Sequence, residues 1–210
     1  DSTGGQFNVA DGSELQLTGD LDASGTFTGA GDGQVRFTGS RLDSVNSDLI
    51  LDFADGMFIW EAGQFRRDLT NVGQITIAGD GGQFVSDSFV NDGSVIQLPG
   101  SVVGSSSDAI NNSSGAIWEL QGDAMITAPS ALSTDRFLNS GTLLKTGTGT
   151  AMVAQGMTHL GGVVDVREGN LVLEHSFQSD SAGGQFIVAG GSELEIIGEL
   201  DASGTFTGAG

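Results

Sequence analysis

Two histidines lie near carboxylates in the C-terminal third of the chain. His159 and His175 are the only histidines, and Asp165, Glu168 and Glu174 lie close to them in the sequence. A histidine beside a carboxylate can serve as a general base or bind a metal ion. The spacing matches no zinc motif, and the chain contains no cysteine. We therefore interpret both as solvated or turn histidines and assign no catalytic residue.

An acidic pair that occurs twice is the best candidate for a metal site. Asp20 and Asp22 correspond to Glu199 and Asp201 in a second copy of the same turn. Carboxylates on stacked turns offer the oxygen ligands that Ca²⁺ prefers. The strict nonapeptide pattern of calcium-binding β-helices is absent. Solvated turn acids are the favoured interpretation and calcium is the alternative; we expect no other cofactor.

The charge balance restricts the partners. The chain has 27 acidic and 7 basic residues and a net charge of −20. It lacks the basic patch that binds nucleic acid, and it would repel a polyanionic polysaccharide. A hydrolase of neutral glycans needs two carboxylates placed across one bond, and no pair stands out among the acids. No apolar run is long enough for a transmembrane helix, so we expect no membrane insertion.

The elements are short strands rather than helices. Apolar and polar residues alternate in segments such as 5–10, 73–79, 93–98, 115–120 and 162–169, and Gly, Asn, Asp and Ser separate them. The alternation predicts an inward set: Phe7, Val9, Leu15, Leu17, Ile75, Ile77, Val95, Ile117, Leu143, Val164, Val166, Leu171 and Leu173. If Ile117 points inward, its neighbour Trp118 points outward, which would make Trp118 an exposed contact for a glycan or another rod.

An asparagine precedes a glycine in several of these units. The motif places Asn71, Asn91, Asn111 (or its neighbour Asn112) and Asn139 in one register. Asparagine tolerates turn conformations, and stacked asparagines can form amide ladders. We expect these residues to form a ladder at a turn of the fold.

These features predict an all-β fold, a parallel β-helix (β-solenoid) of about eight to nine coils of 20–26 residues with little or no helix. A unit of this size cannot bury its apolar face alone, whereas stacked units share one core. A propeller is the main alternative, but its blades need about 40–45 residues. A β-sandwich would not explain the internal repeat.

The chain also repeats itself over a longer distance. Residues 2–31 and 181–210 are identical at 23 of 30 positions, at an offset of 179 residues. We interpret residues 1–210 as one continuous solenoid in which 1–180 is approximately one long repeat and 181–210 begins the next copy. The strand spacings of 20 to 26 residues suggest that the long repeat contains eight coils.

Motifs such as "FLNSGTLLKTGTGTAMV" and "GGVVDVREGNLVLEHS" resemble those of bacterial extracellular β-solenoid repeat proteins. These include autotransporter passenger domains, filamentous-haemagglutinin-like adhesins and giant repetitive surface proteins. The resemblance implies an extracellular or cell-surface location, functions in adhesion or fibre formation, and no transferable active site.

We therefore expect a structural segment of a long extracellular filament whose partners are copies of itself, stacked end to end within one chain or between subunits. The alternative is an adhesin that binds glycans or cell surfaces through longer loops at 99–114 and 128–138. A polysaccharide-cleaving β-helix ranks last, and we expect no enzyme.

Overall fold

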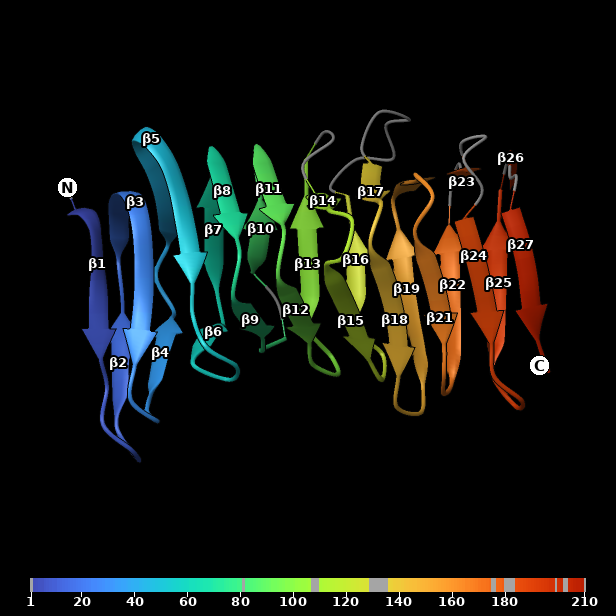
Figure 1. Cartoon of the computed structure of the whole chain (residues 1–210), viewed down its shortest axis with the longest axis horizontal. Coiled ribbons are helices and arrows are strands. Elements are labelled where there is room, and N and C mark those ends of the chain that lie inside the picture. The colour runs from blue at the N-terminus through green and yellow to red at the C-terminus, as the bar shows by residue number, and fades with distance from the viewer. Residues whose placement is uncertain are drawn as a thin grey trace.

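The computed structural model describes residues 2–80, 82–106, 110–128, 136–174, 177–179, 184–198, 200–201 and 204–209. These residues form strands, turns and bends but no helix. Every strand pair among them is parallel. The strands stack along a rod with the two termini at opposite ends (Figure 1). The predicted parallel β-helix is thereby confirmed.

Each coil visits three faces, which we name face I, face II and face III in chain order. Face III is the ten-stranded sheet. Its strands in stacking order are β2 (Glu14–Leu17), β4 (Gln34–Phe37), β6 (Phe58–Trp60), β9 (Gln74–Ile77), β12 (Ser94–Gln97), β15 (Ile117–Gln121), β18 (Thr142–Thr146), β21 (Val163–Val166), β24 (Gly184–Val188) and β27 (Gly204–Gly208).

Faces I and II form one 17-stranded sheet because two long strands, β3 (Asp20–Ala30) and β5 (Arg41–Asp52), cross from one face to the other. Face I contains the first halves of β3 and β5 and then β7 (Gly63–Arg66), β10 (Gln83–Val85), β13 (Val102–Ser105), β16 (Met125–Thr127), β19 (Thr150–Ala154), β22 (Asn170–Glu174) and β25 (Glu193–Ile197). Face II contains β1 (Ser2–Asn8), the second halves of β3 and β5, β8 (Asp68–Asn71), β11 (Ser88–Asn91), β14 (Ile110–Asn112), β17 (Arg136–Asn139), β20 (Gly156–His159), β23 (Phe177–Ser179) and β26 (Leu200–Asp201).

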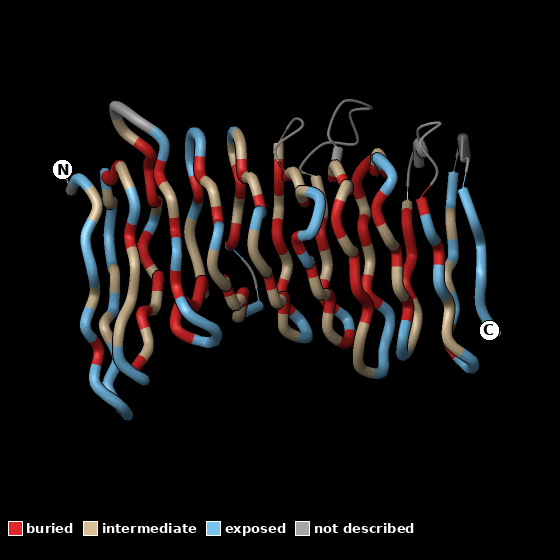
Figure 2. The backbone as a smooth tube through the Cα atoms, viewed as in Figure 1, coloured by how far each residue is buried: buried red, intermediate tan, exposed pale blue. Residues whose placement is uncertain are grey.

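The core follows from the alternation of side chains along each strand, because successive residues point to opposite sides. β9, β12 and β21 each alternate between half-buried and buried residues. Figure 2 shows the buried positions along the middle of the rod and the exposed ones gathered toward both ends. Most of the predicted inward set is buried, whereas Phe7, Leu15 and Leu17 in the first coil are half-buried.

Aromatic side chains form columns through several coils. Phe65 stacks between Phe37 and Phe89, with ring centroids 5.9 Å and 6.0 Å away, and also lies 3.8 Å from the Trp60 ring centroid. The rings come from all three faces, since Phe37 and Trp60 lie on face III, Phe65 on face I and Phe89 on face II, and together they fill the space between the sheets. The columns therefore tie each coil to the coils before and after it.

Two expectations about the path of the chain were wrong. The strand spacings suggest one coil for each step, but the 26-residue step from segment 47–53 to segment 73–79 is longer than one coil. β5 pairs on face II with β8, while β9 lies on face III against β6. The 26 residues between them make one turn and one further face. Segment 99–114 is not a single long loop, since it contains β13 and β14. Of segment 128–138, residues 136–138 lie in β17 and 129–135 lie outside the described residues.

Candidate functional site

A ladder of asparagine amides runs along the end of face II. The Nδ2 of Asn71 donates to Oδ1 of Asn91 at 2.7 Å, and Asn91 donates in the same way to Asn112 at 2.8 Å. Asn112 donates to Asn139 at 2.8 Å, and Nδ2 of Asn139 lies 3.1 Å from Nδ1 of His159. All five side chains are buried. The ladder therefore continues through five coils and includes the ring of His159, which sequence reasoning did not include.

The expected member Asn111 is not part of this ladder. In the parallel register, Asn112 lies opposite both Asn91 and Asn139, whereas Asn111 lies opposite Val90 and Leu138. Neighbouring residues in a strand point to opposite sides, so Asn111 faces outward when Asn112 faces inward. The coil contains two residues between Asn112 and Gly115 instead of one, and this difference obscured the register in the sequence.

Each ladder asparagine also donates to the backbone of the next coil, at the first residue of its face III strand. Nδ2 of Asn91 donates to the carbonyl of Ile117 at 3.0 Å, and Nδ2 of Asn112 donates to that of Thr142 at 3.1 Å. The glycine of the Asn-x-Gly motif is needed for close approach, because a Cβ on Gly93 would lie 2.1 Å from the carbonyl oxygen of Gly73. The motif is thus a device for stacking one turn directly on the next.

A buried lysine binds backbone carbonyls at another turn of the rod. Lys145 is fully buried, and its Nζ donates to the carbonyl oxygens of Thr146 at 2.8 Å, of Gly147, and of Glu168 at 3.0 Å. These three acceptors match the three N–H donors of an ammonium group. Burial lowers the pKa of Lys145, and the carboxylates of Glu168 and Asp123 oppose this effect. The side chain acts as a clamp between two coils.

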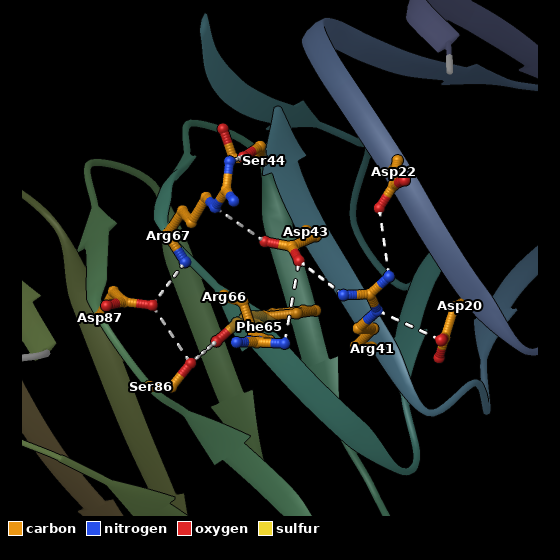
Figure 3. A network of polar contacts seen from close by, with 10 residues as sticks. All are labelled: Asp20, Asp22, Arg41, Asp43, Ser44, Phe65, Arg66, Arg67, Ser86 and Asp87. Atoms are coloured by element: carbon orange, nitrogen blue, oxygen red, sulfur yellow. Dashed lines mark hydrogen bonds and ion pairs between the residues drawn. The ribbon is translucent and has the colours of Figure 1, made fainter. Parts of the chain in front are cut away.

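Arginines and aspartates form a cluster on the outer side of face I (Figure 3). Asp43, whose side chain is 6% exposed, accepts from Arg41 at 3.0 Å and lies 3.4 Å from Arg67 and 4.0 Å from Arg66. Arg67 adopts a left-handed φ of 63°, and its backbone N–H donates to Oδ2 of Asp87 at 2.9 Å.

The cluster gathers three of the chain's few basic residues on adjacent coils, namely Arg41 and the consecutive Arg66 and Arg67. Asp43 in β5 meets arginines of its own coil and of the next, and Asp87 lies one coil further. Opposite charges on successive strands attract, and like charges would repel. The arrangement is a set of ion pairs that join coils.

The calcium candidates Asp20 and Asp22 belong to this cluster. Their carboxylates lie 3.3 Å and 3.6 Å from the guanidinium of Arg41. A cation between them would compete with that positive charge. Glu199 lies outside the described residues, as does the side chain of Asp201. Within the described part of the chain, no group of three or more His, Cys, Asp or Glu side chains is placed to hold a metal ion.

Trp118 is not an exposed contact. Its side chain is 0% exposed, its Nε1 donates to Oε1 of Gln97 at 3.2 Å, and its ring packs edge-on against Phe89 and Phe137. Ile117, expected in the core, is 41% exposed. Both expectations were wrong for the same reason. Alternation along a strand requires that neighbouring residues face opposite sides, but it does not determine which of the two faces inward.

The histidine–carboxylate group of the sequence is not assembled in the described structure. Asp165 accepts from Arg167 at 2.8 Å, and Glu168 uses its carbonyl to bind Lys145. His159 lies inside the rod against the Phe186 ring, at a centroid distance of 5.1 Å. His175 lies outside the described residues.

A cavity of about 240 Å³ lies among apolar side chains of the first coils, including Phe7, Leu21, Phe27, Leu49 and Phe53. Its lining belongs to the same core that the following coils fill with rings and aliphatic side chains. It is therefore a less tightly packed part of the core.

The outermost strands leave pairing edges free within the described structure. β1 and β2 pair only with β3 and β4, and β27 pairs only with β24. The Phe206 side chain in β27 is 56% exposed although its ring stacks on Phe186 at 4.4 Å. An edge of this kind presents unpaired N–H and C=O groups and can accept another strand. These edges are the surfaces with a clear capacity for interaction.

The class of molecule that the fold and these surfaces define is a β-solenoid with stacked side-chain ladders. Comparisons with family models, with curated proteins and with solved structures gave no match. No helix in the described residues is long and apolar enough to cross a membrane.

Proposed function

We propose that this chain is a structural segment of a long repetitive filament outside the cell or on its surface, extended end to end by further copies of the 179-residue repeat. The location rests on the resemblance to extracellular solenoid proteins. The filament rests on how the repeated segment is stacked.

One observation carries the proposal: the same sequence segment occurs once inside the stack and once at its edge. In the first occurrence, β3 pairs with β1 on one side and with β5 on the other, and Phe27 is 8% exposed. In the second, the equivalent Phe206 in β27 is 56% exposed, and β27 pairs only with β24 among the described strands. The first occurrence therefore supports the residues that follow Gly31 as the segment that would cover the edge of the second.

Charge complementarity supports the same continuation. Asp20 and Asp22 are met by Arg41, one coil further along the chain. Glu199 and Asp201 are their counterparts 179 residues later. A following copy would bring the counterpart of Arg41 to the same relative position. The carboxylates of Glu199 and Asp201 would then form ion pairs with a guanidinium group.

The test is a longer chain in which residues 32–210 are appended directly after Gly210, the counterpart of Gly31. We expect electron microscopy to show one unbroken rod, longer by about 40 Å because coils stack at about 4.8 Å. The control inserts a flexible Gly/Ser linker between the copies, which should produce two short rods at variable angles. If the direct fusion also shows two hinged rods, the proposed filament is wrong.

The adhesin alternative makes a different prediction for the chain of residues 1–210. Saturable binding of a defined glycan by this chain, with no continuous rod in the direct fusion, would replace the structural proposal with the adhesin.

A further inference from the structure

The two copies of the repeated segment lie on different faces of the rod. Segment 5–8 lies in β1 on face II, whereas its counterpart 184–187 lies in β24 on face III. Likewise 14–17 lies in β2 on face III, and its counterpart 193–196 lies in β25 on face I. Every described strand of the repeat is displaced by one face in the same direction.

The displacement follows from the number of strand positions in the long repeat. The chain takes 25 steps from one strand position to the next between β1 and β24 when the two halves of β3 and β5 are counted separately. Three positions complete one turn. The 179-residue repeat therefore advances eight and one third turns, and not the eight turns that its spacing suggests.

The repeated sequence can occupy either face because its inward side chains stay inward. Phe7 lies opposite Gly29 in the first copy, whereas Phe186 lies opposite Phe206 in the second, which is a register difference of two residues. A shift of two keeps each side chain on the same side of a strand. The phenylalanine pair is retained: the ring centroids of Phe7 and Phe27 are 5.8 Å apart, and those of Phe186 and Phe206 are 4.4 Å apart.

We infer that successive copies of the repeat are rotated about the filament axis by one third of a turn, so that three copies present the same surface on three sides. This inference rests on the proposed filament. Any surface feature that occurs once per copy, such as the Asp43 cluster on face I, then winds around the rod and returns to its starting side at every third copy. A second filament or a partner that recognises the feature can bind from any of three directions.

Labelled tandem chains test the rotation. Four copies are joined by appending residues 32–210 three times, and Asp55, an exposed turn residue, is changed to cysteine in each copy. The natural chain has no cysteine, so a maleimide-linked gold particle marks each copy once. We expect labels at axial steps of about 40 Å, on three sides in turn, with the fourth label above the first.

A matched variant separates rotation from length. Deleting the 20 residues 72–91 from each copy removes one whole coil, so the axial step should fall by about 4.8 Å while the rotation stays one third of a turn. Four labels along one side of an unbroken rod would overturn the rotation and leave the filament intact. Labels without an unbroken rod would overturn the filament itself.

Discussion

At the scale of single residues, much of the specificity lies in buried polar side chains that connect one coil to the next. Asn91 and Asn112 each donate to an amide in the following coil and to a backbone carbonyl. A buried polar group that loses its partner costs more than the bond itself contributed. The ladder therefore stabilises the observed register between coils, and a shift of one residue would leave buried amides without partners.

The change Asn112→Ala interrupts the ladder at its centre. It removes the acceptor of Asn91 and the donor to Asn139 and to the carbonyl of Thr142. We expect the free energy of unfolding to fall by about 3 kcal/mol, since each stranded buried group costs about 1–3 kcal/mol. Urea denaturation measures the change.

The matched control is Asn111→Ala, the outward neighbour in the same strand. Its effect should stay within about 0.5 kcal/mol, as for other surface substitutions. Equal losses for the two variants would show that the ladder does not contribute as described.

The buried Lys145 makes the free energy of unfolding depend on pH in the alkaline range. Burial lowers its pKa below the usual value of 10.5. Between the two values the unfolded chain binds more protons than the folded one, so the free energy of unfolding rises with pH until about pH 10.5 and is constant above it. Lys145 is the only lysine, and the chain has no tyrosine or cysteine, which leaves this range otherwise free of titrating side chains.

Urea midpoints between pH 9 and 10.5, compared with those of Lys145→Met, measure this contribution. The variant should lose the slope while also losing stability, because the three carbonyls of the clamp lack a donor. A slope that persists in the variant would assign the dependence to another group.

At the scale of elements, the unit of construction is the three-strand coil. β9, β10 and β11 each pair with the strands one coil before and one coil after them. Stability in such arrays is approximately a sum of terms between neighbouring units. The loss of a whole unit therefore removes one set of terms and preserves the others.

Deletion of residues 72–91 joins Asn71 to Asp92 and places Asn71 one coil from Asn112. We expect cooperative unfolding with a slightly smaller dependence on urea, because less surface is exposed on unfolding. Deletion of residues 82–91, about half a coil, should abolish cooperative unfolding because β12 would enter face I and the ladder would break. Circular dichroism during denaturation distinguishes the two, and equal behaviour would contradict the coil as the unit.

At the scale of the whole molecule, the rod has a core that is closed laterally and open along its axis. Phe206, Ile197 and the half-buried Phe7 lie in its outermost coils. Exposed strand edges and exposed apolar side chains are costly for an isolated rod and are removed when another coil covers them. The open direction is the direction of growth in the proposed filament.

Hydrogen exchange reports on this edge. In the chain of residues 1–210, amides of β27 should exchange faster than those of β24, which is paired on both sides. In the directly fused tandem chain, we expect exchange in β27 to slow by at least about tenfold, which corresponds to about 1.4 kcal/mol. Unchanged exchange would show that the next copy does not dock on this edge.

The amino-acid sequence by itself determined the strands, the coil architecture, most of the core and the existence of an asparagine register. These depend on local alternation and on turn residues, which are visible within one unit. The 179-residue repeat was likewise visible without coordinates.

Only the tertiary structure decided which way the alternation faces and on which side of the rod each strand lies. Trp118 and Ile117 exchanged roles, and Asn112 replaced Asn111, because pairing with neighbouring coils selects one of two equivalent parities. The extra third of a turn in the long repeat also depends on strand pairing. A step of 26 residues can form one long coil, or one coil and the strand of a further face. Only the pairing of β5 with β8 distinguishes the two. The pairing of Arg41 with Asp20 and Asp22 likewise depends on the register between coils.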